Sequence, residues 1–444
     1  MCAAWRGRNE SQIRWQKSAN DCHCRHSLRQ GTLGFPGLQT YRAMDALIPS
    51  ALARSGSRRT KRRALLAGAC MIVAGLAAWF ALQVHQDPGG VPAPQVETGP
   101  AATRPEIPAN PGHPGRARPL VAVVGHNANT ELTDFVVPYG VLKRADVADV
   151  VAVGTQAGPI QLFPAFRVEP DTTVAAFDAR FPGGADYVVV PAVHEDDDPH
   201  LLTWVRQQWA KGATVIGVCD GVWVLARAGL LAGRRATSHW YARDALARQF
   251  PQTQWVSDRR YVVDDRVVTT TGVTASVPVT LALIETIGGT DRARAVADAV
   301  GASDWSTAHA SAGFRLSPRH LYTAAGNMLA LWRHESLGAA LHPGGDDVAL
   351  ALVADAHART YLTSVLATAD TPNGVRMASG LVFVPDRVGT AAQALAPLSG
   401  LAPSRPALAA LDAALAEIGQ RHGADTAALV ALQLEYPMRR AARP

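Results

Sequence analysis

A strand that turns abruptly into a helix at a cysteine is the feature that most constrains this chain of 444 residues. Residues 213–231 read ATVIGVCDGVWVLARAGLL, a β-branched run followed by apolar residues at helical spacing. The change falls at Cys219, Asp220 and Gly221. An α/β enzyme places a nucleophile at such a corner, because the new helix offers free backbone N–H groups and a dipole that favours a thiolate.

A buried core cysteine is the alternative, since a free Cys behaves as a small hydrophobe. The other four cysteines all precede residue 85: Cys2, Cys22, Cys24 and Cys70. Cys219 therefore has no partner for a disulfide in the region that follows, which suits a reactive thiol. The pair at 22 and 24 lacks a second pair of ligands, so we expect no metal site there and no cofactor.

Three blocks of sequence resemble the ThiJ/PfpI family. The first, GVCDGVWVLARAGLLAGRRATSHW at 217–240, is similar to the Cys-to-His-Trp block of the amidase-like domain of GlxA-type regulators and of isonitrile hydratases. The others are VVTTTGVTASVPVTLALIE at 267–285 and TDF at 133–135 with Pro138. The resemblance covers about residues 119–290 and implies a class I glutamine amidotransferase-like fold, which is a flavodoxin-like three-layer α/β sandwich with a mainly parallel sheet.

The order of apolar segments predicts the same class without the resemblance. LVAVVGH at 120–126 is typical of a strand covered on both faces, and an apolar stripe predicts a helix over 130–145. Further strands are predicted at 147–154 and 185–192. This alternation indicates a parallel sheet with helices on both faces.

The resemblance implies a role for each residue of the site. Asp134 would approach Cys219 and relay a proton, and His239 is the histidine of the T-x-H-W block. The backbone N–H groups of Asp220 and Gly221 would receive developing negative charge. By residue type alone, Asp134 would be an exposed helix carboxylate and His239 a structural histidine.

Two departures from the family pattern concern the chemistry. Asp220 follows the cysteine, where isonitrile hydratases have Thr and the proteolytic branch has His. A carboxylate beside a thiolate raises the pKa of the thiol unless its own charge is paired. The Gly-Gly after the fourth strand is replaced by Ala-Val-His at 192–194, so the resemblance does not carry an oxyanion donor over to these positions.

The amino-terminal part predicts a membrane anchor. Residues 1–63 indicate a basic, disordered cytoplasmic tail, and residues 64–84 form an apolar run without a charge that is long enough to span a bilayer. The basic residues before it place the amino terminus in the cytoplasm, so we expect a single pass through the inner membrane and a periplasmic main domain. A cleaved signal peptide is the alternative. An over-extended start, with Met44 as the true first residue, is a further hypothesis.

The charge is unevenly distributed along the chain. Residues 1–118 carry 16 Lys and Arg against 6 Asp and Glu, whereas residues 119–444 carry 27 against 31. The folded part is thus mildly acidic, and the pI near 9.2 does not indicate nucleic-acid binding. Residues 85–118 are rich in Pro and Gly and predict an extended linker.

Residues 291–444 predict a mostly helical extension of unknown role. Helical patterns occur at 292–301, 319–337, 346–369 and 405–433, with one strand candidate at 380–385, and we find no internal repeat. Residues 308–326 faintly resemble the second helix-turn-helix of AraC-type regulators. They lack a cluster of Lys and Arg and follow the predicted anchor, so we expect no nucleic-acid partner.

The sequence leaves more than one function open. The main hypothesis is a membrane-anchored, extracytoplasmic ThiJ/PfpI-type hydratase or amidohydrolase that uses Cys219 on a small electrophile. The alternative is a non-catalytic ligand-binding or redox-sensing regulatory module, as in the amidase-like domain of GlxA-type regulators. A cysteine protease is disfavoured because no His follows Cys219. The expected partner is a small-molecule substrate or ligand, with a homodimer as one assembly open to the chain.

Overall fold

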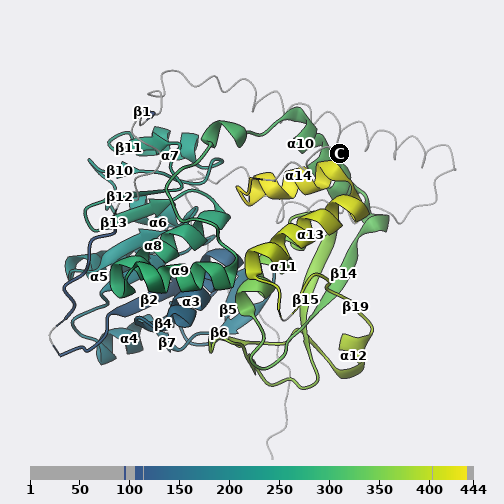
Figure 1. Ribbon diagram of the computed structural model, residues 1–444, viewed down its shortest axis with the longest axis horizontal. Coiled ribbons are helices and arrows are strands. Elements are labelled where there is room, and N and C mark those ends of the chain that lie inside the picture. Colours follow the sequence, from purple (N-terminus) through teal and green to yellow (C-terminus); the bar gives the residue numbers. More distant parts are fainter. Residues whose placement is uncertain (1–94, 97–105, 114, 403, 438–444) are drawn as a thin grey trace, which may run out of the picture. The chain divides into compact units, whose positions relative to one another are not determined.

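The computed structural model describes residues 95–96, 106–113, 115–402 and 404–437. Its main sheet has the strand order β12-β13-β9-β8-β2-β4-β7 and is parallel except for the hairpin of β12 and β13 (Figure 1). The strands are β2 (Leu120–Gly125), β4 (Asp149–Gly154), β7 (Thr172–Thr173), β8 (Tyr187–Val190), β9 (Thr214–Gly217), β12 (Tyr261–Asp264) and β13 (Val267–Thr270). The flavodoxin-like α/β part of the predicted fold is confirmed.

Helices cover both faces of this sheet. Alternation along β2 divides the core, since Val121 and Val123 join one apolar cluster while Ala122 and Val124 join the other. The first cluster takes helices α3 (Leu132–Ala145), α8 (Ser276–Gly288) and α9 (Thr290–Val300). The second takes α4 (Val174–Arg180), α5 (Pro199–Ala210), α6 (Gly221–Arg227) and α7 (Arg243–Gln249).

The region after residue 300 contains a second parallel sheet, in the order β18-β15-β14-β19. Its strands are β14 (Glu335–Ala340), β15 (Thr363–Ala369), β18 (Arg387–Val388) and β19 (Ala396–Pro397). The helices of this region are α10 (Pro318–Leu329), α11 (Asp347–Ala358), α12 (Gly389–Gln393), α13 (Ala407–His422) and α14 (Ala424–Gln433). Helix α11 connects β14 to β15 and packs against α3 of the first part.

Helices predominate over strands in the described part of 291–444, but two of the predicted helices are corrected. The predicted helix 319–337 holds α10 and runs into β14, and the predicted helix 346–369 holds α11 and ends in β15. In both cases a short buried strand continues the apolar pattern, and periodicity alone does not separate such a strand from a buried helix.

One of two smaller sheets joins the two parts. Strands β3, β5, β6, β16 and β17 form this sheet, in the order β16-β17-β6-β5-β3. These are β3 (Thr130–Glu131), β5 (Ile160–Phe163), β6 (Arg167–Glu169), β16 (Val375–Arg376) and β17 (Val382–Phe383). A third sheet contains β1 (Gln95–Val96), β10 (Arg235–Ala236) and β11 (Gln254–Ser257), and short 3-10 turns are η1 (Val273–Ala275), η2 (Ser311–Gly313) and η3 (Leu331–Arg333).

The predicted membrane anchor is also corrected. Within the described residues, no helix combines the length and the apolar character needed to cross a bilayer. Residues 64–84, on which that prediction fell, lie outside the described residues, as do the tail 1–63 and most of the linker 85–118. The prediction rested on the length of one apolar run. The transmembrane helix, the inner-membrane localisation and the periplasmic placement are withdrawn.

Close packing of α3 on α11 predicts an effect at Gly140. A Cβ atom there would lie 2.6 Å from Cγ2 of Val348, whereas one at Gly326 in α10 would meet nothing within 4 Å. Both glycines are helical, so Gly326→Ala should stabilise by about 0.5–1 kcal/mol, as helix propensity dictates. Gly140→Ala should instead lower the free energy of unfolding by about 1–3 kcal/mol through overpacking. Urea unfolding of both variants measures these changes in the free energy of unfolding. Equal changes in the two variants would contradict the close packing of α3 on α11.

Asp347 in the same interface predicts a pH dependence of stability. It is fully buried, and burial raises its pKa to about 6. The folded state keeps this proton after the unfolded chain has lost it, so this residue's contribution to stability is present below about pH 4 and is lost as the pH rises to 6. Between pH 4 and pH 7 the free energy of unfolding of Asp347→Asn should therefore rise by about 2–3 kcal/mol relative to that of the unmodified chain. Urea unfolding at both pH values tests this, with exposed Asp370→Asn as the control for formal charge.

Candidate functional site

The corner predicted at Cys219 is present between β9 and α6. Cys219 has φ 54°, in the left-handed region that non-glycine residues seldom adopt, and its backbone N–H donates to Oγ1 of Thr270 at 3.1 Å. Gly221 is required because a Cβ atom there would lie 2.1 Å from the carbonyl oxygen of Val190. The backbone is thus held in a strained turn at the carboxyl end of a central strand.

The thiol at this corner is buried and acidic groups surround it. Cys219 is 5% exposed. Burial raises its pKa well above the ordinary value, and the carboxylates of Asp134, Asp220 and Glu131 raise it further, while the guanidinium of Arg359 opposes them. Burial and the surrounding carboxyl groups therefore oppose the expected activation of a thiolate by the start of α6 and favour the neutral thiol.

Asp134 lies where the resemblance implies, and it is not the exposed helix carboxylate that residue type alone suggests. It is fully buried in the first turn of α3. Its Oδ2 accepts a hydrogen bond from the N–H of Ala192 at 3.2 Å, and its Oδ1 has no hydrogen-bond partner among the described residues. Burial, and then the nearby Glu131, raise its pKa well above the ordinary value. Since the Ala192 N–H serves Asp134, it is not free as an oxyanion donor.

Asp220 and His239 also converge on the sulfur. Ligand atoms of Cys219, Asp220 and His239 lie within 4.8 Å of one another. His239 Nε2 lies 3.2 Å from the carbonyl oxygen of Gln433, which orients the ring. Oδ1 of Asp220 is buried without a hydrogen-bond partner in the described part of the chain. One thiol, one carboxylate and one imidazole in this arrangement could ligate a metal ion, while the expectation that none is bound stays a prediction.

Arg359 is the main residue of the site that the sequence did not indicate. It follows α11 in the second part of the chain, and its Nη2 lies 2.7 Å from Oε1 of Glu131. Its Nε donates to both carboxylate oxygens of Asp355 at 2.9 Å. Arg359 is thereby fixed as the cation that partly offsets the carboxylates near Cys219. Because Arg359 lies 228 positions after Glu131, no local sequence pattern predicts the pair.

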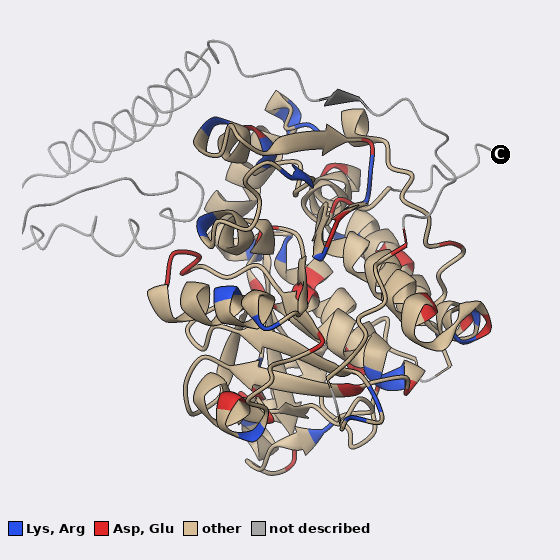
Figure 2. Ribbon diagram, turned by 90° about the vertical axis from the view of Figure 1, so that its left-hand side faces the viewer, with Lys and Arg blue, Asp and Glu red and all other residues tan. Residues whose placement is uncertain are grey.

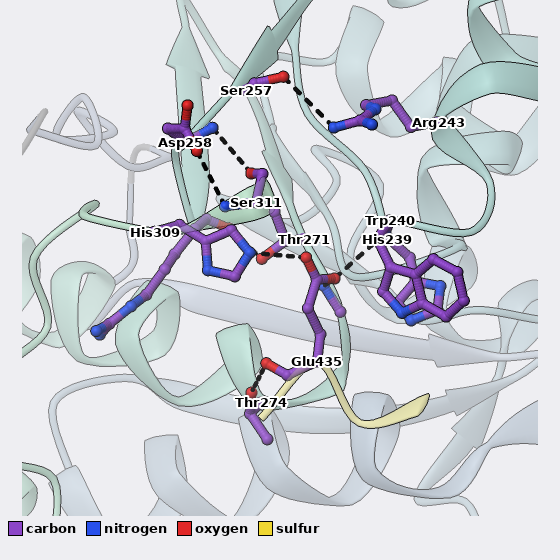
Figure 3. A network of polar contacts seen from close by, with 12 residues as sticks. His239, Trp240, Arg243, Ser257, Asp258, Thr271, Thr274, His309, Ser311 and Glu435 are labelled. Atoms are coloured by element: carbon purple, nitrogen blue, oxygen red, sulfur yellow. Dashed lines mark hydrogen bonds and ion pairs between the residues drawn. The ribbon is translucent and has the colours of Figure 1, made fainter. Parts of the chain in front are cut away.

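Glu435 is the second such residue, and it lies at the centre of the network in Figure 3. It follows α14 and is 3% exposed. Its Oε2 accepts hydrogen bonds from the N–H groups of Gly272 at 2.6 Å and Trp240 at 3.3 Å, and its Oε1 lies 2.8 Å from His309 Nε2. Glu435 therefore helps to hold the T-x-H-W block in place by a hydrogen bond to Trp240.

Comparison with known proteins identifies the family. The chain matches the model of the DJ-1/PfpI family over residues 121–286. It is 33% identical over 169 residues to the isonitrile hydratase of Pseudomonas putida, which covers 37% of this chain and 70% of that protein. A flavodoxin-like domain with a cysteine at a strand-to-helix corner defines the class of protein. The chain belongs to the DJ-1/PfpI family.

Other relatives are regulators. The chain is 43% identical over 86 residues to the HTH-type transcriptional regulator CdhR of Pseudomonas aeruginosa, covering 19% of this chain and 25% of that protein. For the regulator GlxA of Rhizobium meliloti the identity is 36% over 96 residues, 22% of this chain and 29% of that protein. The chain thus matches about a quarter of the length of these regulators. Among solved structures, Drosophila melanogaster DJ-1beta has 21% identity and a TM-score of 0.38, covering 42% of this chain and 99% of that one.

These findings correct the main functional hypothesis. A membrane-anchored hydratase or hydrolase required a spanning helix, which the described residues do not contain, and an activated thiolate, which the buried and acidic surroundings of Cys219 oppose. The relatives named as HTH-type transcriptional regulators agree better with the alternative, a regulatory module.

The protonation state of Cys219 predicts slow alkylation. In a full-length chain with Ser at positions 2, 22, 24 and 70, iodoacetamide should label Cys219 at neutral pH more than about tenfold more slowly than in denaturant, since the thiolate is the reacting form. Mass spectrometry of timed samples measures the two rates. Native labelling as fast as in denaturant would show that the thiol is open and ionised.

Proposed function

We propose that this chain is a non-catalytic module that binds a small molecule beside Cys219, as in the amidase-like domain of GlxA-type regulators. The observation that carries the proposal is the buried, neutral thiol among carboxylates. Such a thiol is a poor nucleophile and also a poor redox sensor, because oxidation follows thiolate character and exposure. Ligand binding is therefore favoured over the redox-sensing half of the alternative.

The unpaired polar atoms of the site suggest the chemistry of the ligand. Oδ1 of Asp134 and Oδ1 of Asp220 are buried acceptors without partners in the described residues. A buried acceptor left unpaired costs about 1–3 kcal/mol, so a molecule that donates hydrogen bonds to both would be stabilised. Three carboxylates face Cys219 and one guanidinium opposes them. Burial raises the pKa of Asp134 and of Asp220, and an ammonium group bound beside them would stabilise their ionised forms. The site therefore favours a small amine over a carboxylic acid.

The proposal is regulatory because the domain would act by binding the small molecule and not by converting it. The expectation of no nucleic-acid partner loses its support, because it relied on a periplasmic placement and because relatives are named HTH-type transcriptional regulators. In the described chain, residues 308–326 contain η2 and the first part of α10. Figure 2 shows Lys and Arg spread over many elements of the ribbon. We assign no nucleic-acid contact to these residues.

Thermal denaturation of the full chain with a panel of small amines, amides and carboxylic acids tests the proposal. An amine that binds should raise the unfolding temperature as its concentration increases. At a concentration one hundred times its dissociation constant, it should add about 2.7 kcal/mol to the free energy of unfolding. Asp134→Asn and Asp220→Asn should each reduce this gain, while Asp244→Asn, on exposed α7 surface, serves as the matched control. Consumption of the compound that depends on Cys219 would contradict the non-catalytic assignment.

A further inference from the structure

The second part of the chain repeats the element order of the first at a nearly constant distance in sequence. Each of six elements begins 215 residues after a counterpart of the same type, and β15 begins 214 residues after β4. The pairs are β2 with β14, α3 with α11, β5 with β16, β6 with β17, β7 with β18 and α4 with α12. β19 pairs in parallel with β14 as β8 does with β2. An order and spacing this regular is that of a repeated unit.

Individual hydrogen bonds repeat with the same spacing. Glu131 caps α3 by accepting from the N–H of Asp134, and Asp346 caps α11 by accepting from the N–H of Ala349. Both residues of the second cap lie 215 positions after those of the first. Likewise Asp171 Oδ2 accepts from the N–H of Ala152 at 2.8 Å, and Asp386 Oδ2 accepts from that of Ala367 at 2.9 Å.

The repeat also shows which part of the domain the second copy lacks. Gly289 joins α8 to α9 with φ 82° and ψ 167°, and Gly423 joins α13 to α14 with φ 93° and ψ 155°. Helix α13 packs on α11 as α8 packs on α3. Between β19 and α13, however, the second copy has no counterpart of β9, the cysteine corner, α6, β12 or β13 in the described residues.

The two copies meet through contacts that exchange equivalent residues. In the antiparallel pairing of β6 with β17, Val168 lies opposite Phe383, its own counterpart. Arg144 forms an ion pair with Asp346, and Arg359 forms one with Glu131. Residues 346 and 359 are the counterparts of 131 and 144, so one ion pair is made twice with its partners exchanged. Reciprocal contacts of this kind are the signature of a twofold interface.

We infer that residues 335–433 are a shortened second copy of residues 120–300, docked on the first about a local twofold axis, so that one chain builds both sides of a dimer-like interface. The face of α3 is then covered by α11 of the same chain (Figure 1). Only the first copy keeps a cysteine corner. The second copy supplies Arg359, a positioning residue whose ion pair with Glu131 lies beside Cys219, whereas the Arg144–Asp346 pair is its equivalent in the copy without a corner.

The equivalence of the two arginines provides matched variants. In the full-length chain with Cys219 as its single cysteine, both Arg359→Gln and Arg144→Gln should lower the unfolding temperature, because each breaks its copy of the exchanged ion pair. Arg359→Gln should lower it more, because Arg359 also pairs with the buried Asp355, whose counterpart is Gly140. Only Arg359→Gln should shift the alkylation of Cys219 to higher pH, since Arg359 opposes the effects of Asp134, Asp220 and Glu131 on the thiol. An equal shift in both variants, or none in Arg359→Gln, would overturn the assignment of Arg359 to the site.

Light scattering on the full-length chain tests the interface itself. A molar mass of one chain is expected, because the face that a partner would use is already occupied. A dimer that Arg144→Glu dissociates would overturn the inference, since that face would then be joining two chains. A dimer that persists in Arg144→Glu uses another surface and agrees with the inference. These outcomes do not depend on whether the site binds an amine.

Discussion

Confinement of several carboxylates around one buried thiol is the constraint on which the rest of this structure depends. Asp134 and Glu131 are brought in by α3, Asp220 by the corner after β9, and Arg359 by the end of α11. Buried charges are tolerated only when they are paired or protonated. Arg359 pairs with two carboxylates, burial raises the pKa of Asp134 and Cys219, and the site rests in a neutralised state that does not favour a thiolate.

The same constraint explains why the second part of the chain is needed. Arg359 and Glu435 both come from beyond residue 334, and they contact the amino end of α3 and the T-x-H-W block. The inferred twofold-related copy brings Arg359 to that position because the Arg–carboxylate pair of the interface is made twice with its partners exchanged. The site and the interface therefore share residues: the first copy carries the corner at Cys219, and the second copy provides Arg359 next to it.

A buried cysteine with unpaired acceptors beside it agrees with the proposed binding of a small molecule. The strained backbone at Cys219 is retained, and strain of this kind persists where surrounding structure over-determines it. Thr270 bonds the backbone of the corner, and Gly221 allows the close approach of Val190. The corner is thus a rigid frame that holds Cys219 and Asp220 in place.

By itself the sequence determined the family, the parallel sheet, the corner at Cys219 and the approach of Asp134 and His239, because each is written in local periodicity or in a contiguous motif. Only the tertiary structure decided the burial of the thiol among carboxyl groups, the contacts of Arg359 and Glu435, and the second sheet. Arg359 and Glu435 contact residues 228 and 163 positions away, and no local pattern records such pairs. The repeat escaped the sequence because its copies share backbone geometry and caps, such as Glu131 and Asp346, while few side chains are identical.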